Sequence, residues 1–482
     1  MPTFLHGVET VESAVGPRPV RSVRTAVVGL VGTAPIWQAD AADRRVNEPV
    51  LITGDVDAEK YFGSADVAGY TIPAALKAIF DQGAGAVIVV NVFDPAVHHV
   101  AVPLNEHASS DDVYRLVHRG VSNVVVTDDG GANYVGGGVD YTVDAAAGTV
   151  TRAPGGAIPA GTALLISYSR PHPAGVTPVQ VIGGVNGAGK RTGMQALRDA
   201  AAVIGFGPKL LLAPAFDSQA TVVAELLTIA EQLRAIALWD APVGTTVANA
   251  IAGRGPSGAI NFASSSGRGV ACYPHVRVLD AASGDVVLAP YAPRVAGAIA
   301  ARDERDGYQV SPSNMEIRGI VGMERPLTAD FRDASSDVNR LNEVGIVTIY
   351  HGFGSGLRVW GNRTTAWPAD THPLNFIPVR RTADMLYDAV ELIAMQYLGQ
   401  PYTAATVDVV RESVNAFLRS LMAEGRLIAG ECTFDPARNT ADKIAAGHLT
   451  FDISFMPPTV AERFTLSAFV DTSLLSALAP AA

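Results

Sequence analysis

The stretch from Asn375 to Gly399 reads NFIPVRRTADMLYDAVELIAMQYLG, and the rest of the chain can be organised around it. Its large apolar residues recur at i, i+4, i+7 and i+11, the spacing of one helix face: Leu386, Val390, Ile393 and Tyr397. Thr382 stands where an N-cap residue belongs, and Gly399 with Pro401 closes the element. We therefore predict a helix over this stretch.

A second helix and two strands follow it. The second helix ends before Gly425, a favourable C′ residue, and carries one apolar stripe: Val407, Val410, Val414, Phe417, Leu418 and Leu421. Residues 448–455 alternate apolar and polar side chains, which predicts a strand with one buried face. Residues 462–471 alternate again through Phe464, Leu466, Ala468 and Val470. A final strand with no later partner must pair backwards or pair with another molecule.

The composition is typical of a globular chain. Its 482 residues are 48% hydrophobic and 17% charged, which fits roughly two to four domains with large cores. No apolar run approaches the roughly 20 residues of a membrane helix, and the N-terminus has no secretion signal. Two cysteines, Cys272 and Cys432, form no disulfide framework and fit a reduced compartment. The net charge of −11 argues against a nucleic-acid partner.

Two separate parts of the chain, residues 25–97 and 180–365, alternate predicted strands and helices. Alternation of this kind predicts an α/β domain with a mostly parallel sheet. The predicted strands are residues 25–31, 85–93, 179–182, 209–213, 235–239, 270–278, 286–289, 346–350 and 357–360. The predicted helices are residues 71–82, 194–204, 219–234 and 293–302.

The segment between these two parts, residues 98–179, has a different composition. Short β-rich pieces at 123–127, 141–143, 149–152 and 163–169 are separated by glycine-rich turns, which predicts a small all-β domain inserted into the α/β domain. Asp128 and Asp129 fit a hairpin turn, because the spaced acidic residues of a calcium loop are absent.

A glycine loop from Gly184 to Lys190 fits the pattern G-x-x-x-x-G-K of a phosphate-binding loop. The next residue must be Ser or Thr to hold magnesium, but here it is Arg191. The nearest candidate for a second magnesium ligand is Asp240, after Leu238 and Trp239. The motif is therefore incomplete, and we favour a structural glycine loop capped at Thr192. An α/β enzyme that binds a nucleotide or phosphate at this loop remains the alternative.

Other chemistry is poorly supported. A serine protease needs a nucleophile, a base and an orienting acid, and no serine here has the subtilisin-type or nucleophile-elbow context. His275, His351 and His372 have no assignable partner. His98 and His99 are adjacent, so on a strand they face opposite ways, and no Cys/His spacing suits zinc. We expect no catalytic residue, no metal and no cofactor.

The region from Asn375 onward also resembles a known family. Phe376-Ile377-Pro378-Val379-Arg380-Arg381, the two helices, Asp442-Lys443 and the alternating strand are similar to the C-terminal domain of tail sheath proteins of contractile phage tails and R-type bacteriocins. The segments 192–197, 207–209 and 212–214 resemble the central sheath motif, whose domain is often called subtilisin-like. The resemblance runs from the first residues to the final strand.

The N-terminus is interpreted with the help of this resemblance. Residues 2–24 contain scattered apolar side chains, Val8, Val11 and Val15, and a stiff Gly16-Pro17-Arg18-Pro19, so they fit either a frayed end or an arm ordered on a neighbour. Gly7-Val8-Glu9 followed by Gly16-Pro17-Arg18-Pro19 is similar to the opening of sheath proteins, which favours an arm.

The resemblance implies a structural protein and four parts of the chain. These are a linking arm at 1–24, a central α/β domain at 25–97 and 180–365, an inserted β domain at 98–179, and an α+β C-terminal domain with a linking strand at 366–482. Subunits would form stacked six-membered rings around a tail tube, with a baseplate, a tail terminator and no membrane insertion. They would assemble in the host cytoplasm into a virion tail or a phage-tail-like particle. Candidate assembly residues are Val8, Val11, Val15, Phe464, Leu466 and Val470, and candidate tube-facing residues are Arg380, Arg381 and Lys443.

Overall fold

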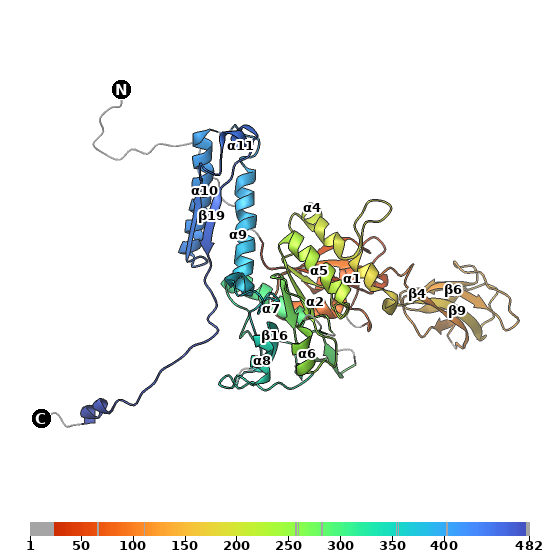
Figure 1. The fold of residues 1–482 in the computed structure, drawn as a ribbon. Coiled ribbons are helices and arrows are strands. Elements are labelled where there is room, and N and C mark those ends of the chain that lie inside the picture. Colours follow the sequence, from red (N-terminus) through yellow and green to blue (C-terminus); the bar gives the residue numbers. More distant parts are fainter. Residues whose placement is uncertain are drawn as a thin grey trace, which may run out of the picture.

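A computed structural model describes residues 24–478 except 65, 66, 110, 256, 257, 259, 281, 282, 353, 355 and 402. Figure 1 shows a central sheet flanked by helices, with a β-rich unit projecting on one side and a long helical unit on the other. The C-terminal segment leaves the molecule as an extended chain on the side away from the β-rich unit (Figure 1). The described part of the chain is therefore mixed α/β, as predicted.

The central sheet has eight strands in the order β17-β16-β12-β11-β10-β1-β3-β2. Their bounds are β1 Val27–Gly32, β2 Pro49–Ile52, β3 Ala86–Asn91, β10 Leu210–Leu212, β11 Ile236–Asp240, β12 Gly269–Cys272, β16 Ile346–His351 and β17 Leu357–Trp360. The six inner strands are parallel, and β2 and β17 pair antiparallel at the two edges. Both faces of the inner strands are buried, which is why they appear in sequence as continuous apolar runs.

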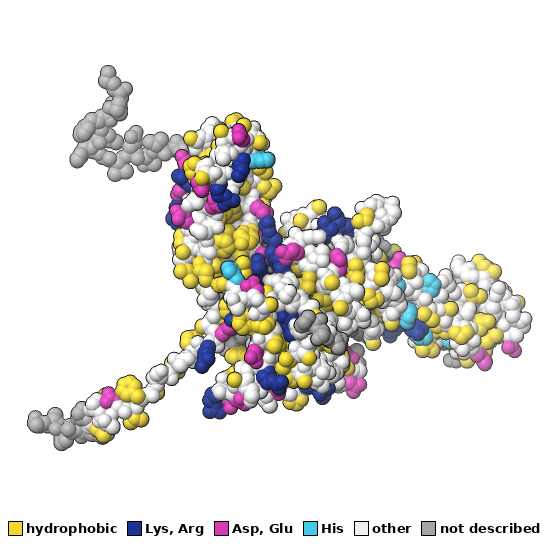
Figure 2. Space-filling view, viewed as in Figure 1, with side chains coloured by type: hydrophobic (Ala, Val, Ile, Leu, Met, Phe, Trp, Pro, Cys, Tyr) yellow, Lys and Arg dark blue, Asp and Glu magenta, His cyan; other side chains and the backbone are white. Residues whose placement is uncertain are grey.

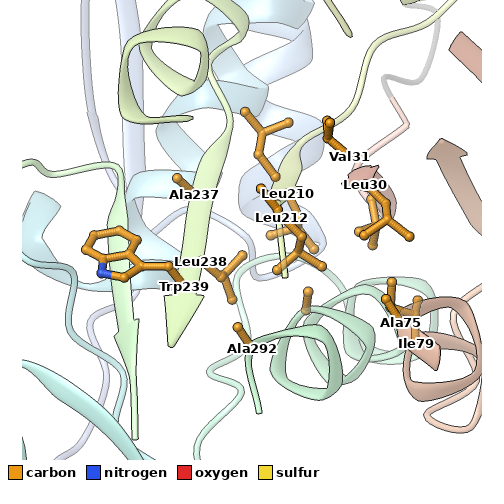
Figure 3. Packing of buried hydrophobic residues seen from close by; sticks show 14 of the residues in the cluster. Leu30, Val31, Ala75, Ile79, Leu210, Leu212, Ala237, Leu238, Trp239 and Ala292 are labelled. Carbon is orange, nitrogen blue, oxygen red and sulfur yellow. The ribbon is translucent and has the colours of Figure 1, made fainter. Parts of the chain in front are cut away.

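Helices cover this sheet. They are α1 Asp55–Phe62, α2 Ile72–Phe80, α3 Pro178–Ile182, α4 Ala200–Ile204, α5 Ala220–Leu233, α6 Val247–Gly253, α7 Ala292–Asp306 and α8 Asp337–Glu343. Figure 3 shows Ala75 and Ile79 of α2 and Ala292 of α7 near Leu30 and Leu212 on the sheet. One continuous hydrophobic core joins these elements, and its largest fully buried side chain is Trp239.

The β-rich unit consists of two antiparallel three-stranded sheets, β4-β9-β6 and β5-β8-β7. The strands are β4 His99–His107, β5 Val113–Arg115, β6 Ser122–Thr127, β7 Tyr141–Asp144, β8 Thr149–Arg152 and β9 Leu164–Pro171. A core of its own, with Tyr114, Val150 and Ile166 fully buried, lies between them. Asp128 accepts a hydrogen bond from the Ala132 amide at 2.8 Å, so it forms the predicted turn.

The C-terminal unit comprises α9 Ile377–Met395, α10 Ala404–Ala423, β18 Ala429–Thr433, α11 Ala441–Ala445 and β19 Asp452–Met456. The predicted stripes of α9 and α10 meet in a third core around Leu386, Ile393, Val414 and Leu418, with Phe451, Ile453 and Phe455 packed against it. The central unit contains a small three-stranded sheet in addition to the eight-stranded one. Its order is β14-β13-β15, with β13 Val276–Leu279, β14 Val286–Ala289 and β15 Gly322–Met323.

Several local predictions were wrong: the helix predicted at 194–204 is a 3₁₀ helix, Gly193–Asp199, followed by the short α4, and residues 462–471 form no strand. Three further cases have a clear reason. Residues 179–182 form helix α3, not a strand, because Thr177, Pro178 and Gln180 supply a capping box with proline in the first turn. Thr382 is not an N-cap, because α9 begins five residues earlier at Ile377, and the Thr382 hydroxyl donates to the Pro378 carbonyl. The strand predicted at 270–278 is two strands, β12 and β13.

Candidate assembly surfaces

The C-terminal arm, defined here as residues 457–478, exposes a row of large apolar side chains. Its predicted strand at 462–471 is an extended chain without a partner strand in the described structure. Phe464 is 82% exposed, Leu466 91% and Val470 94%. Figure 2 shows the arm as a thin extension with hydrophobic patches. Phe469, 84% exposed, is also on the arm, but in an alternating strand it falls on the face opposite to Phe464 and Leu466.

Strands β18 and β19 form a two-stranded antiparallel sheet in the C-terminal unit. Each has one strand neighbour among the residues that the structure describes, so each has an open edge. An open edge presents unpaired backbone N–H and C=O groups to another chain. The molecule therefore carries both an unpaired extended segment and an edge that can accept one.

The base of α9 is fastened to the central unit by a buried ion pair. The Arg381 guanidinium contacts both carboxylate oxygens of Asp303 in α7, and its Nη2 donates to the Thr25 carbonyl at 3.0 Å. The side chains of Arg381 and Asp303 are 5% and 1% exposed. Bidentate geometry of this kind fixes orientation as well as distance.

Further charged contacts follow one another along α9. Asp384 accepts bonds of 2.6 and 2.9 Å from Arg268, which also pairs with Glu231. Burial raises the pKa of Asp384 above its ordinary value, while the hydrogen bonds from Arg268 oppose that shift. One turn later, Asp388 pairs with Lys209 and with Arg234, whose Nη1 lies 3.0 Å from Oδ1. These contacts join α9 to strands and helices of the central unit.

The three predicted tube-facing residues lie in different surroundings. Arg381 was wrongly proposed as a surface contact, because it is buried and paired with Asp303. Arg380 is half-buried beside Gly267. Lys443 is exposed on α11, where its ammonium group donates to the Arg438 carbonyl at 3.0 Å. Val8, Val11 and Val15 lie outside the described residues.

The Gly184–Lys190 loop does not have the geometry of a phosphate-binding loop. Helix α3 precedes it instead of a strand, and the segment after it begins with a 3₁₀ helix, Gly193–Asp199. Asn186 closes the loop on itself, since its side chain accepts bonds of 3.0 Å from the Ala188 and Lys190 amides. Thr192 accepts a bond of 3.1 Å from the Gly184 amide. The loop is therefore a closed turn between two short helices.

A buried acidic pair lies at the carboxyl ends of β10 and β11. The Asp240 amide donates to Asp217 Oδ2 at 3.1 Å, and both Asp240 carboxylate oxygens accept from the Ala292 amide at the start of α7, each at 3.0 Å. Burial raises the pKa of Asp217 to about 7 and raises that of Asp240 as well, partly through the charge of Asp217. These contacts tie strand ends to a helix and leave Asp240 no role at the glycine loop.

Among the residues that the structure describes, the predicted histidine candidates form no reactive centre. His351 and His372 contact neighbouring backbone groups, Gly352 O and Leu374 N. Within the described ranges, no three His, Cys, Asp or Glu side chains gather as metal ligands. In that same part of the chain, no helix is long and apolar enough to cross a membrane. Cys272 and Cys432 are both buried free thiols.

Comparisons with known proteins agree with this arrangement. The profile of the phage tail sheath protein central domain matches residues 189–365, that of the phage tail sheath C-terminal domain matches 369–471, and that of the tail sheath protein Gp18 domain III N-terminal region matches 25–92. The tail sheath protein of Burkholderia phage BcepMu is 45% identical over 479 residues, which cover 98% of each chain. The tail sheath protein of Escherichia phage P2 is 26% identical over 478 residues, 99% of this chain and 98% of that one.

Solved structures show the same fold. The helical sheath of the anti-feeding prophage in its contracted state aligns with a TM-score of 0.61 at 19% identity, over 97% of this chain and 100% of that one. The contracted sheath complex of an extracellular contractile injection system, PVC, aligns with a TM-score of 0.59 at 15% identity, over 98% of this chain and 99% of that one.

The family matches define a structural protein and give no support to the enzyme alternative. The chain belongs to the phage tail sheath protein family, which confirms the resemblance seen in its sequence. It is a component of a phage tail or of a phage-tail-like particle.

Proposed function

We propose that this chain polymerises as stacked six-subunit rings around a tail tube, and that contraction of the resulting sheath drives the tube through a cell envelope. The observation that carries the proposal is that one chain contains both an unpaired apolar arm and a two-stranded sheet with open edges. The 45% identity to a tail sheath protein over the whole chain supports it. The energy of contraction would be stored in the extended lattice, so no cofactor is required.

The linkage works by strand addition. The arm of one subunit lies along the open edge of β18 or β19 of a neighbour, where main-chain hydrogen bonds supply affinity and alternate side chains supply register. Burying one Val, Leu or Phe side chain is worth about 1.5–3 kcal/mol, whereas ordering one arm residue costs about 1–2 kcal/mol in backbone entropy. One linkage alone is therefore weak, and several per subunit hold the lattice together by avidity.

The proposal also places the β-rich unit and the C-terminal unit within the particle, according to the side of the central sheet on which each lies. The β-rich unit projects from the central sheet on the side away from the C-terminal unit (Figure 1). In the proposed particle it lies on the outside. The C-terminal unit, roughly residues 366–482, faces the tube, with Arg380 and Lys443 as contacts to an acidic tube surface. The domain boundaries at 24, 97, 179 and 365 are part of this proposal, as are the tube, baseplate and tail terminator proteins as partners. Assembly takes place in the cytoplasm of the host bacterium.

Deletion of residues 1–20 tests the linking role of the N-terminal arm. We expect the truncated protein to stay soluble and to melt cooperatively, but to form no tubes under conditions in which the full chain does. Circular dichroism measures the melting, and negative-stain electron microscopy measures the tubes. Normal polymerisation of the truncated chain, or its failure to fold, would overturn the assignment of this segment as a linking arm.

A further inference from the structure

The C-terminal arm is fastened to the body of the subunit at Glu462. The Glu462 carboxylate accepts two bonds from Arg363, from Nε to Oε1 at 2.8 Å and from Nη2 to Oε2 at 2.5 Å. Two parallel bonds from one guanidinium to one carboxylate fix both position and direction. Glu462 is therefore held in place, although the apolar side chains just beyond it, such as Phe464 and Leu466, are exposed.

Arg363 is itself held on several sides. Its guanidinium carbon lies 3.7 Å from the centre of the Phe376 ring and 4.2 Å from that of Trp367. Its Nη1 donates to Asn375 Oδ1 at 2.5 Å, and its side chain is only 15% exposed. A cation that is packed on aromatic faces and shielded from water is a strong anchor. Because Phe376 directly precedes α9, the anchor also ties the arm to the base of that helix.

The ion pair spans an opening. A cleft of about 520 Å³ lies beside it, with Val460, Ala461 and Phe464 of the arm on one wall and Trp360 and other residues of the central unit on the other. A cleft lined by both segments means that the arm here is not packed along its whole length against the central unit. The direction in which the arm leaves the subunit then depends on the Arg363–Glu462 contact.

We propose that Arg363 and Glu462 form a fixed joint that sets where the C-terminal linking arm leaves the subunit and in which direction it points, and that a second copy of this chain is the partner toward which the joint aims it. This inference rests on the proposed linking role of the arm and adds the residues that position it. Arg363 and Glu462 are positioning residues, since Phe464, Leu466 and Val470 supply the contact with the neighbour.

The joint shortens the part of the arm that is free to move. With Glu462 held, the free segment up to Asp471 is nine residues, from 463 to 471, whereas without the pair it begins after the buried Pro457 and is fourteen, from 458 to 471. Effective concentration falls roughly as the −3/2 power of tether length, so loss of the joint lowers it about twofold for each linkage from length alone. An arm that no longer leaves the subunit in a fixed direction has a still lower effective concentration at the neighbour. The loss in affinity multiplies over the linkages that each subunit makes in the lattice.

The joint can be tested first in the unassembled subunit. Spin labels at Arg340→Cys on α8 and Thr465→Cys on the arm report the distance between the body and the arm by pulsed electron paramagnetic resonance, because the native Cys272 and Cys432 are buried. We expect a narrow distance distribution for the labelled parent and a clearly broader one after Glu462→Gln. An equally narrow distribution in the Glu462→Gln protein would show that the Arg363–Glu462 pair does not fix the arm.

Assembly is measured next on unlabelled full-length protein by sedimentation of tubes. We expect Glu462→Gln and Arg363→Gln each to raise the subunit concentration needed for tubes at least about twofold. Arg463→Gln, which removes the exposed charge next to Glu462, is the matched control and should leave that concentration unchanged. If Glu462→Gln broadens the distance distribution but assembles like the parent, the joint does not position the arm for assembly, and the inference is wrong.

A truncation separates this inference from the proposed function. Removal of residues 464–482 keeps the joint but deletes the contact surface. If this truncated protein still forms normal tubes, the proposed linking role of the arm is wrong, and so is the inference about the joint. If the truncation abolishes tubes while Glu462→Gln does not alter them, only the joint fails.

Discussion

Removal of one partner of the buried Arg381–Asp303 pair should destabilise the subunit strongly. In Arg381→Met the side chain keeps a similar length but loses its charge, so Asp303, 1% exposed, is left as a buried carboxylate without its cation. The Thr25 carbonyl loses a donor as well. Breaking a buried pair in this way costs about 3–5 kcal/mol. At about 2 °C per kcal/mol for a large domain, the melting temperature should fall by about 6–10 °C.

Calorimetry or circular dichroism at neutral pH measures this change in melting temperature. Two further variants serve as a control and a rescue. Arg380→Met alters the adjacent, half-buried arginine, which forms no direct ion pair with the described residues although its charge acts on Asp384, and should lower the melting temperature by less than about 2 °C. Arg381→Met combined with Asp303→Leu replaces the whole pair with apolar groups and should recover most of the loss, because the stranded charge is gone. If Arg381→Met melts within about 2 °C of the parent, the pair does not hold α9 to the central unit, and our reasoning about the base of that helix is refuted.

Three further outcomes are expected. Lys190→Ala should assemble and contract normally, because the glycine loop is a closed turn; loss of contraction together with nucleotide hydrolysis by the parent protein would overturn this. Burial raises the pKa of Asp217 to about 7, so the folded state binds that proton more tightly than the unfolded state, and the stability it contributes is lost as pH rises from about 4 to about 7. Asp217→Asn should therefore flatten the decline in melting temperature over that pH window, and an unchanged slope would contradict the assignment. Leu466→Asp should raise the concentration needed for tubes far more than Thr465→Asp, measured by sedimentation, because only Leu466 lies in the predicted covered row; equal effects would argue against strand addition in that register.

Much of the fold was predictable because its signals are local. The inner strands of the sheet are continuous apolar runs, and α5 and α10 carry single apolar stripes, so periodicity alone finds them. Strand β4 was missed because most of its residues are exposed and it contains a proline and one charged residue, Glu106. Helix α3 was misassigned because a short apolar run does not distinguish a helix from a strand, and the deciding signal was the capping box that begins at Thr177.

The functional surfaces were only partly predictable. The alternating row through Phe464 and Leu466 is a local signal, and these side chains are exposed in the structure, whereas their partner stays a prediction. Arg363 and Glu462 are 99 residues apart, and Arg381 and Asp303 are 78 apart, so no spacing rule relates them. Arg381 looked like a surface contact in sequence because arginine is usually exposed, and only tertiary packing reveals the carboxylate that neutralises it.

A helical reconstruction of tubes formed by the purified full-length chain tests the central claim most directly. We predict rings of six subunits in which residues 464–470 of one subunit form a strand beside β18 or β19 of a neighbour. The β-rich unit should lie on the outer surface, and the C-terminal unit should line the lumen. Tubes in which this segment stays unpaired or folds back on its own subunit would contradict the account.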